Sequence, residues 1–216
     1  MEIWLDTTDT KTVQLGHKLG ILMGVTTNPS LISESEKTLE EVLDDMLKAQ
    51  SGLVTAQVTA ADHSAIIEQA ETLRDFSERI IVKIPVTQEG LRAMASLSHL
   101  HIPIMATAIF TTSQALLACL AGACYLAPYF SHLEMPIETL ESILFMLERY
   151  AFETKMVVAS LKHFKQIEDC LDLGVDAITL KKELFDEFIA DHPKTFESLD
   201  RFSRDWKKAK PSKLFP

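Results

Sequence analysis

The sequence has 216 residues, of which 47% are hydrophobic and 24% are charged, and its formal net charge is −10. This composition is typical of a globular protein with a full core and excludes an intrinsically disordered chain. The negative charge argues against binding to nucleic acid or to an anionic membrane, because both partners call for a basic surface.

The sequence carries no pattern typical of a membrane span, a signal peptide or a disulfide framework. No apolar run approaches the roughly 20 residues of a membrane span, and residues 1–6 lack the basic and then apolar pattern of a signal peptide. The three cysteines, Cys119, Cys124 and Cys170, include no Cys-x-x-Cys pair. We therefore expect a cytoplasmic protein without a disulfide framework.

Short β-rich runs recur along the chain and predict eight strands. They cover residues 2–6, 23–26, 54–59, 80–84, 103–107, 124–127, 156–160 and 177–180. Helical patterns separate most of them, which indicates parallel strands with right-handed crossovers. Eight such units can close on themselves, and residues 5–8 are not the glycine-rich loop typical of an open doubly wound sheet. We predict a (β/α)8 TIM barrel with an additional C-terminal helix.

Several helices have clear boundaries in the sequence. Thr38 and Glu41 form a capping box before the apolar stripe of residues 39–47, and Gly122 follows a helix over 111–121. Residues 28–35 look like a loop. A last helix over 194–210 carries an apolar stripe: Phe196, Leu199, Phe202 and Trp206. We predict that 1–216 form one barrel domain, with this helix packing on the barrel or on a neighbouring subunit.

Polar side chains stand at seven of the eight predicted strand ends, and the eighth offers only Thr179, to which we assign no role. In this fold the active site forms at the carboxyl ends of the strands. The residues at the seven ends are Asp6, Thr26 with Asn28, Gln57, Lys83, Thr107, Tyr129, and Ser160 with Lys162. This mouth is the candidate site.

Lys83 lies within the apolar strand 80–84. Burial disfavours the charged form of a lysine and lowers its pKa, and the neutral amine can attack a carbonyl to form a Schiff base. A strand lysine can equally reach the barrel rim or pair with a carboxylate. Its position alone leaves both possibilities open.

The neighbouring strand ends favour aldol chemistry. Tyr129 can carry a proton, directly or through a water held by Gln57 and Thr107, although an aromatic side chain can also simply pack at the rim. Asp6 could stabilise the charged lysine or contact the substrate, or else cap a helix. The seven histidines show no metal-binding spacing, so we expect no metal and no cofactor.

The chain resembles, essentially from end to end, the family of small transaldolases and fructose-6-phosphate aldolases, which are class I aldolases. The main markers are Gly-Val-Thr-Thr-Asn-Pro at 24–29 and Val-Lys-Ile-Pro at 82–85. The resemblance implies that Lys83 forms the Schiff base. It further implies that Asp6, Thr26 and Asn28 hold the donor, and that Ser160 and Lys162 hold the phosphate-bearing end of the substrate.

Two positions distinguish the subgroups of this family. The transaldolase-like members carry glutamate and phenylalanine where this chain has Gln57 and Tyr129, so the chain is similar to the aldolase-like subgroup. It departs from the family at His132, which replaces an arginine that contacts phosphate, and at Phe164-Lys165, which replace Pro-Arg. Histidine is a weaker, pH-dependent anion contact than arginine.

We therefore predict a class I aldolase that reversibly cleaves fructose 6-phosphate, or a related ketose, to dihydroxyacetone and an aldehyde such as glyceraldehyde 3-phosphate. The first alternative is a transaldolase that transfers a dihydroxyacetone unit between sugar phosphates. The second is a non-catalytic sugar-phosphate-binding barrel. The expected partner is a small sugar or sugar phosphate. The resemblance also implies a homo-oligomer, a pentamer or a decamer.

Overall fold

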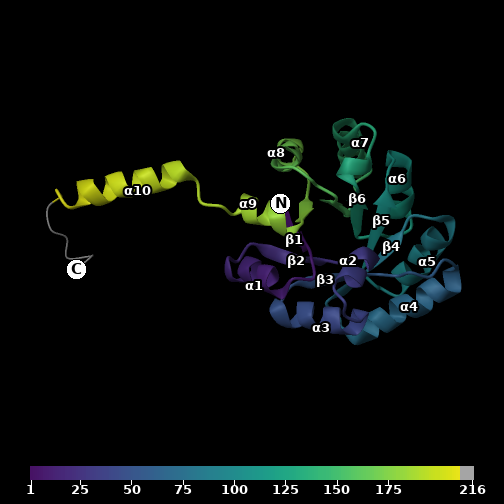
Figure 1. Cartoon of the computed structure of the whole chain (residues 1–216). Coiled ribbons are helices and arrows are strands. Elements are labelled where there is room, and N and C mark those ends of the chain that lie inside the picture. Colours follow the sequence, from purple (N-terminus) through teal and green to yellow (C-terminus); the bar gives the residue numbers. More distant parts are fainter. Residues whose placement is uncertain (210–216) are drawn as a thin grey trace.

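Eight parallel strands close into a barrel in sequence order (Figure 1), which confirms the predicted (β/α)8 TIM barrel. The structure is a computed structural model and describes residues 1–209. The strands are β1 Glu2–Asp6, β2 Leu22–Thr26, β3 Leu53–Gln57, β4 Ile80–Pro85, β5 Ile104–Ile109, β6 Tyr125–Pro128, β7 Lys155–Val158 and β8 Ala177–Leu180.

Helices surround the barrel and alternate with its strands (Figure 1). They are α1 Thr10–Lys18, α2 Pro29–Glu34, α3 Leu39–Ala49, α4 His63–Phe76, α5 Gln88–His99, α6 Thr112–Leu120, the 3-10 turn η1 Phe130–His132, α7 Pro136–Arg149, α8 Phe164–Leu173, α9 Lys182–Phe188 and α10 Pro193–Trp206. None of the helices within residues 1–209 is long and apolar enough to cross a bilayer.

Two strands end two residues earlier than predicted. After β3, the backbone N–H of Thr59 donates to Oε1 of Gln69 (2.8 Å) instead of continuing the ladder. After β7, Ser160 adopts a left-handed backbone with φ 62°, which turns the chain out of the sheet. In both places the chain leaves the strand where it enters the mouth of the barrel.

The loop expected over 28–35 is wrong, because this segment contains α2. Asn28 caps the helix by accepting from the N–H of Leu31 (3.1 Å), and Pro29 occupies the first turn, where its missing N–H costs nothing. The helix has only six residues. It is too short to display an apolar stripe in the sequence.

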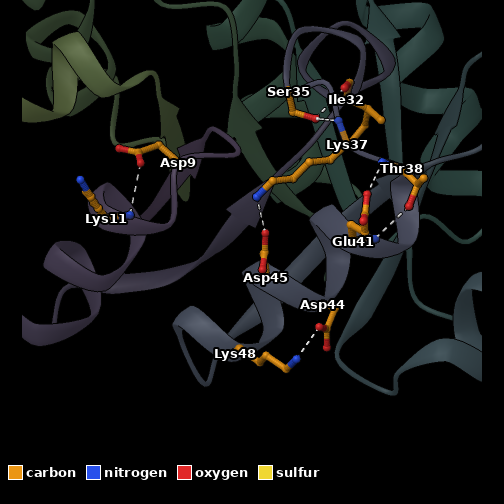
Figure 2. Close-up of polar contacts among 10 residues, drawn as sticks. All are labelled: Asp9, Lys11, Ile32, Ser35, Lys37, Thr38, Glu41, Asp44, Asp45 and Lys48. Carbon is orange, nitrogen blue, oxygen red and sulfur yellow. Dashed lines mark hydrogen bonds and ion pairs between the residues drawn. The ribbon is translucent and has the colours of Figure 1, made fainter.

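The predicted capping box of α3 is confirmed (Figure 2). The N–H of Thr38 donates to Oε2 of Glu41 (2.9 Å), and the N–H of Glu41 donates to Oγ1 of Thr38 (3.2 Å). Figure 2 also shows the exposed ion pair between Lys37 and Asp45 (2.7 Å). Exposed pairs of this kind stabilise a fold by less than about 1 kcal/mol, so the cap is the stronger local determinant.

The interior of the barrel is filled by its own apolar cluster, separate from the larger core between strands and helices. Trp4 is fully buried there, and its ring meets Tyr125 edge-on with centroids 5.5 Å apart. Trp4 Nε1 donates to Oε2 of Glu2 (3.1 Å), and the Glu2 carboxylate also pairs with Nζ of Lys155 (2.5 Å). This plug closes the amino-terminal end and leaves the opposite end open for chemistry.

Helix α10 lies apart from the barrel, beyond α9 (Figure 1). Its apolar side chains are more than half exposed, with Phe196 at 53% and Phe202 at 58%. Residue 210 of the predicted helix lies outside the described part of the chain. The helix does not lie on its own barrel. Of the two predicted alternatives, packing on a neighbouring subunit therefore stays the prediction.

Candidate active site

A cavity of about 460 Å³ opens at the carboxyl ends of the strands. Eight of the nine predicted site residues line it: Asp6, Thr26, Asn28, Gln57, Lys83, Tyr129, Ser160 and Lys162. The ninth, Thr107, is fully buried and contacts the phenol of Tyr129. The closed barrel therefore brings together residues that are up to 156 positions apart in the sequence.

Lys83 points into this cavity from β4 and is 4% exposed. Its Nζ donates to the backbone carbonyl of Thr27, at 3.3 Å. Burial lowers the pKa of the Lys83 amine below its usual range, and the negative charge of Asp6 opposes that shift. The protein thus holds in its cavity an amine that loses its proton more easily than a lysine in water.

A pair of buried threonines fixes the carbonyl that Lys83 contacts. The N–H of Thr27 donates to Oγ1 of Thr55 (3.1 Å), and Oγ1 of Thr27 donates to the carbonyl of Thr55 (2.6 Å). These two bonds link the end of β2 to β3. Since the Thr27 backbone cannot rotate freely, the amine of Lys83 meets an acceptor at a fixed place.

Asp6, Thr26 and Asn28 form one hydrogen-bonded group beside Lys83. Oγ1 of Thr26 donates to Oδ1 of Asp6 (2.9 Å), and Nδ2 of Asn28 lies 3.5 Å from the same oxygen. Because Oδ1 of Asn28 already caps α2, its amide nitrogen is the end that faces the carboxylate. The group places hydroxyl, carboxylate and amide functions against one part of the cavity, as a polyhydroxy ligand needs.

Asp6 does not cap a helix, which was the alternative left open by the sequence. The cap of α1 is Asp9, which accepts from the N–H groups of Lys11 and Thr12, both at 3.3 Å. Asp6 stays at the end of β1 with its carboxylate in the cavity. Its charge therefore acts on Lys83 and on any ligand.

Tyr129 and Thr107 are in contact at the cavity, which Gln57 also lines. The phenol oxygen of Tyr129 lies 3.0 Å from Oγ1 of Thr107. Oε1 of Gln57 is buried and has no hydrogen-bond partner among the described residues. An unpaired buried acceptor is costly and is typically satisfied by a bound water or a ligand group. These three residues could therefore hold a water and pass a proton through it.

A bulge in β5 helps to orient this proton-transfer group. The register of β5 with β6 shifts between Thr107 and Ile109, and the intervening Ala108 has φ 56°. The carbonyl of Ile109 accepts from the N–H of Tyr129, at 3.4 Å. Bulges of this kind re-aim side chains next to active sites.

The outer end of the cavity is positively charged. Lys162 and Lys181 line it together with Ser160 and His132. Among the described residues that line the whole cavity, Asp6 is the only carboxylate, against three lysines counting Lys83. In a chain with a net charge of −10 this is a local reversal, and it suits an anionic group on the ligand.

Two polar residues at the end of β8 line the cavity and were missed as site residues in the sequence: Thr179 and Lys181. The signal that could have found them is their position, because β8 neighbours β1 once the barrel closes and must then share its mouth. Within residues 1–209, no three His, Cys, Asp or Glu side chains come together as metal ligands.

Comparison with known proteins agrees with this geometry. Residues 3–213 match the model of the family described as Transaldolase/Fructose-6-phosphate aldolase. A "Probable transaldolase" of Carboxydothermus hydrogenoformans is 35% identical over 97% of this chain and all of that protein. One of Coprothermobacter proteolyticus is 37% identical over 96% of this chain and 97% of its own, and one of Aquifex aeolicus is 34% identical over the full length of both. The chain belongs to the transaldolase/fructose-6-phosphate aldolase family of enzymes.

Proposed function

We propose that this protein is a transaldolase that transfers a dihydroxyacetone unit between sugar phosphates through a Schiff base on Lys83. The observation that carries the proposal is the buried amine of Lys83, in a cavity that also holds Asp6 and Tyr129. The relatives named "Probable transaldolase" support transfer more than the free cleavage that we put first from the sequence.

The first stage forms the covalent link. The neutral Nζ of Lys83 attacks the C2 carbonyl carbon of the ketose, and uptake of one proton with loss of water leaves an iminium. The lowered pKa of Lys83 raises the fraction of neutral amine available for this attack. Asp6, Thr26 and Asn28 bind hydroxyl groups of the donor and hold its carbonyl against the amine.

The second stage breaks the C3–C4 bond. The iminium takes up the electron pair of that bond, and the C4 hydroxyl proton passes to the oxygen of Tyr129, which must be deprotonated to receive it, directly or through a water near Gln57 and Thr107. The aldehyde leaves, and an enamine stays on Lys83. Attack of the enamine on a second aldehyde, with return of the proton, completes the transfer. No water is consumed overall, because the water lost on forming the iminium is used again when the product is released.

Fructose-6-phosphate aldolase activity is the second candidate. It is favoured by Gln57, whose amide cannot itself accept a proton in place of a carboxylate, and by the 3.0 Å contact between Tyr129 and Thr107. In that reaction the enamine is protonated at C3, and hydrolysis releases free dihydroxyacetone. The same nucleophile serves both reactions.

A coupled assay separates the two candidates. Fructose 6-phosphate is supplied with and without erythrose 4-phosphate, and free dihydroxyacetone and new ketose are both measured. Turnover that depends strictly on the acceptor supports the transaldolase, whereas dihydroxyacetone released without an acceptor supports the aldolase. If borohydride and dihydroxyacetone leave no adduct on Lys83 of the folded protein, both candidates fail.

The phosphate of the substrate is proposed to lie at the outer end of the cavity. Ser160 and Lys162 are the predicted contacts there, and Lys181 adds a second lysine where His132 replaces the arginine of the family. Neither lysine side chain forms an ion pair with another residue in the described part of the chain. Both ammonium groups are therefore available to a phosphate.

The Lys181→Met variant tests this placement. We expect its KM for phosphorylated sugars to rise about five- to tenfold, with little change in kcat, because one partly solvated charge contact is lost. The matched control is Lys182→Met, because the neighbouring Lys182 pairs with Asp186 instead of lining the cavity. An equal effect on phosphorylated and unphosphorylated aldehydes, or an equal effect in both variants, would contradict the assignment.

The remaining expectations stay predictions. We propose that the protein acts in the cytoplasm, and that the chain forms a single barrel domain whose helix α10 packs on a neighbouring subunit of a pentamer or decamer. The exposed apolar stripe of α10 supports the last point. Light scattering measures the mass of the assembly, and a monomer at micromolar concentration would contradict it.

A further inference from the structure

Thr179 completes a line of three oxygen atoms at the floor of the cavity. Its Oγ1 lies 2.7 Å from Oγ1 of Thr26, which in turn lies 2.9 Å from Oδ1 of Asp6. Both threonines are almost fully buried, at 4% and 1% exposed. The line crosses three adjacent strands, because β1 pairs with β2 on one side and with β8 on the other.

Proton counting sets the direction of this line. A carboxylate can only accept hydrogen bonds, so the single hydroxyl proton of Thr26 is donated to Asp6. The hydroxyl of Thr26 then has no proton left for Thr179. The proton between the two threonines must therefore come from Thr179, and the line runs from Thr179 through Thr26 to Asp6.

This direction decides what the two hydroxyls can offer to a ligand. Each has already donated its only proton, so toward the cavity each presents lone pairs alone. A ligand hydroxyl can donate to them, whereas a carbonyl, carboxylate or phosphate oxygen would meet lone pairs and be repelled. The anion-binding outer end, with Lys162 and Lys181, has the opposite preference. The donor end thus accepts hydrogen bonds from a ligand, whereas the lysines of the outer end donate them.

We propose that Thr179 is a positioning residue of the donor end, which donates its proton to Thr26 and so holds the Thr26 oxygen, whose own proton is directed at Asp6, in place for hydroxyketone donors. The inference rests on the proposed function and deepens it. The ligand class is an α-hydroxyketone, whose hydroxyl group donates to the cavity floor. The same arrangement orients the substrate, because its phosphate fits only the opposite end.

The central test is Thr179→Val, which keeps the shape of the side chain and removes its proton. Donor binding is followed as the dihydroxyacetone concentration that half-saturates the borohydride-trapped adduct on Lys83, measured by mass spectrometry. We expect this concentration to rise about five- to tenfold, because a buried hydrogen bond is lost and the Thr26 hydroxyl is then held by Asp6 alone. The KM for the acceptor aldehyde should change less than twofold. Thr179→Ser restores the donor proton and should return binding to within about twofold of wild type.

A double-mutant cycle shows whether Thr179 acts through Thr26. In a Thr26→Val background the hydroxyl that Thr179 holds is gone, so Thr179→Val should add less than about twofold. Thr154→Val is the matched control, since it removes a hydroxyl bonded to the carbonyl of Ala123 (2.8 Å) at the far end of the barrel. It should leave donor binding unchanged.

Several results would overturn the inference while leaving the Schiff-base proposal intact. The first is a half-saturating dihydroxyacetone concentration that is unchanged in Thr179→Val. The second is a rise of about five- to tenfold caused by Thr179→Val in the Thr26→Val background as well. The third is a Thr179→Ser variant that binds the donor as weakly as Thr179→Val. If the valine variant does not fold, as judged by circular dichroism, Thr179→Ala takes its place in the cycle. Absence of any adduct in the wild-type protein would instead overturn the proposed function.

Discussion

Replacing Lys83 by methionine is expected to abolish activity and to make the protein more stable. The variant loses the only nucleophile of the proposed mechanism, so turnover should fall by at least about 10⁴-fold. Its stability should rise by about 1–2 kcal/mol, or roughly 2–8 °C in Tm, because an amine that is 4% exposed is replaced by an apolar chain of similar length. Mass spectrometry after borohydride treatment and thermal unfolding measure the two effects.

A second lysine provides the matched control. Lys155 pairs with Glu2 at the amino-terminal end of the barrel, away from the cavity. Lys155→Met should keep its activity and lose about 0.5–1 kcal/mol of stability, since it breaks a partly exposed ion pair. The two substitutions therefore have opposite expected effects on stability. A Lys83→Met variant that retains activity would contradict the mechanism and revive the non-catalytic barrel.

The stability difference should also depend on pH. The pKa of Lys83 in the folded protein is lowered from its usual value of 10.5, mainly by burial. Between those two values the unfolded chain binds the proton and the folded chain does not, so the wild-type free energy of unfolding rises with pH in that interval. The methionine variant lacks this rise. Its advantage should therefore be greatest below the folded-state pKa and shrink as the pH approaches 10.5.

The barrel could be predicted because each strand and helix repeats a local signal. Alternating β-rich runs and apolar stripes survive in the sequence wherever the element is long enough, as with the capped helix α3. The missed helix and the misplaced strand end had other causes. Helix α2 is too short for a stripe, and the end of β7 depends on the left-handed backbone of Ser160, which its sequence does not signal.

The site residues likewise divide into those that the sequence signals and those that it does not. Lys83 could be found because a charged residue in an apolar strand is costly and therefore conspicuous. Thr179 and Lys181 were not assigned, because a threonine and a lysine after a strand are ordinary in sequence and only their place at the eighth strand end marks them. Their importance comes from the closure of β8 against β1, which sets one beside Thr26 and places the other at the rim of the cavity. Local patterns carry no record of such long-range neighbours.

Removing the phenol of Tyr129 is expected to separate bond cleavage from Schiff-base formation. In Tyr129→Phe the kcat for cleavage or transfer should fall by about 10²- to 10³-fold, because proton transfer to and from the C4 oxygen is lost. The amine of Lys83 and the donor-binding group of Asp6 and Thr26 are unaltered. Borohydride should therefore still trap a dihydroxyacetone adduct on Lys83, with a half-saturating concentration within about threefold of wild type.

Thr107→Val is a milder variant at the same place, because it keeps the phenol of Tyr129 and removes the hydrogen-bond partner of that phenol at 3.0 Å. Its kcat should fall only about tenfold, because the proton carrier is still present but poorly oriented. If Tyr129→Phe kept more than a tenth of the wild-type kcat, Gln57 and its water would have to move the proton without the phenol. Because an amide is not a base at neutral pH, that water would then need another base, and Asp6 is the only carboxylate among the described residues that line the cavity. A double-mutant cycle of Tyr129→Phe and Asp6→Asn distinguishes these routes, because Asp6→Asn lowers kcat by a larger factor in the Tyr129→Phe background than in the wild type only if Asp6 had taken over the proton.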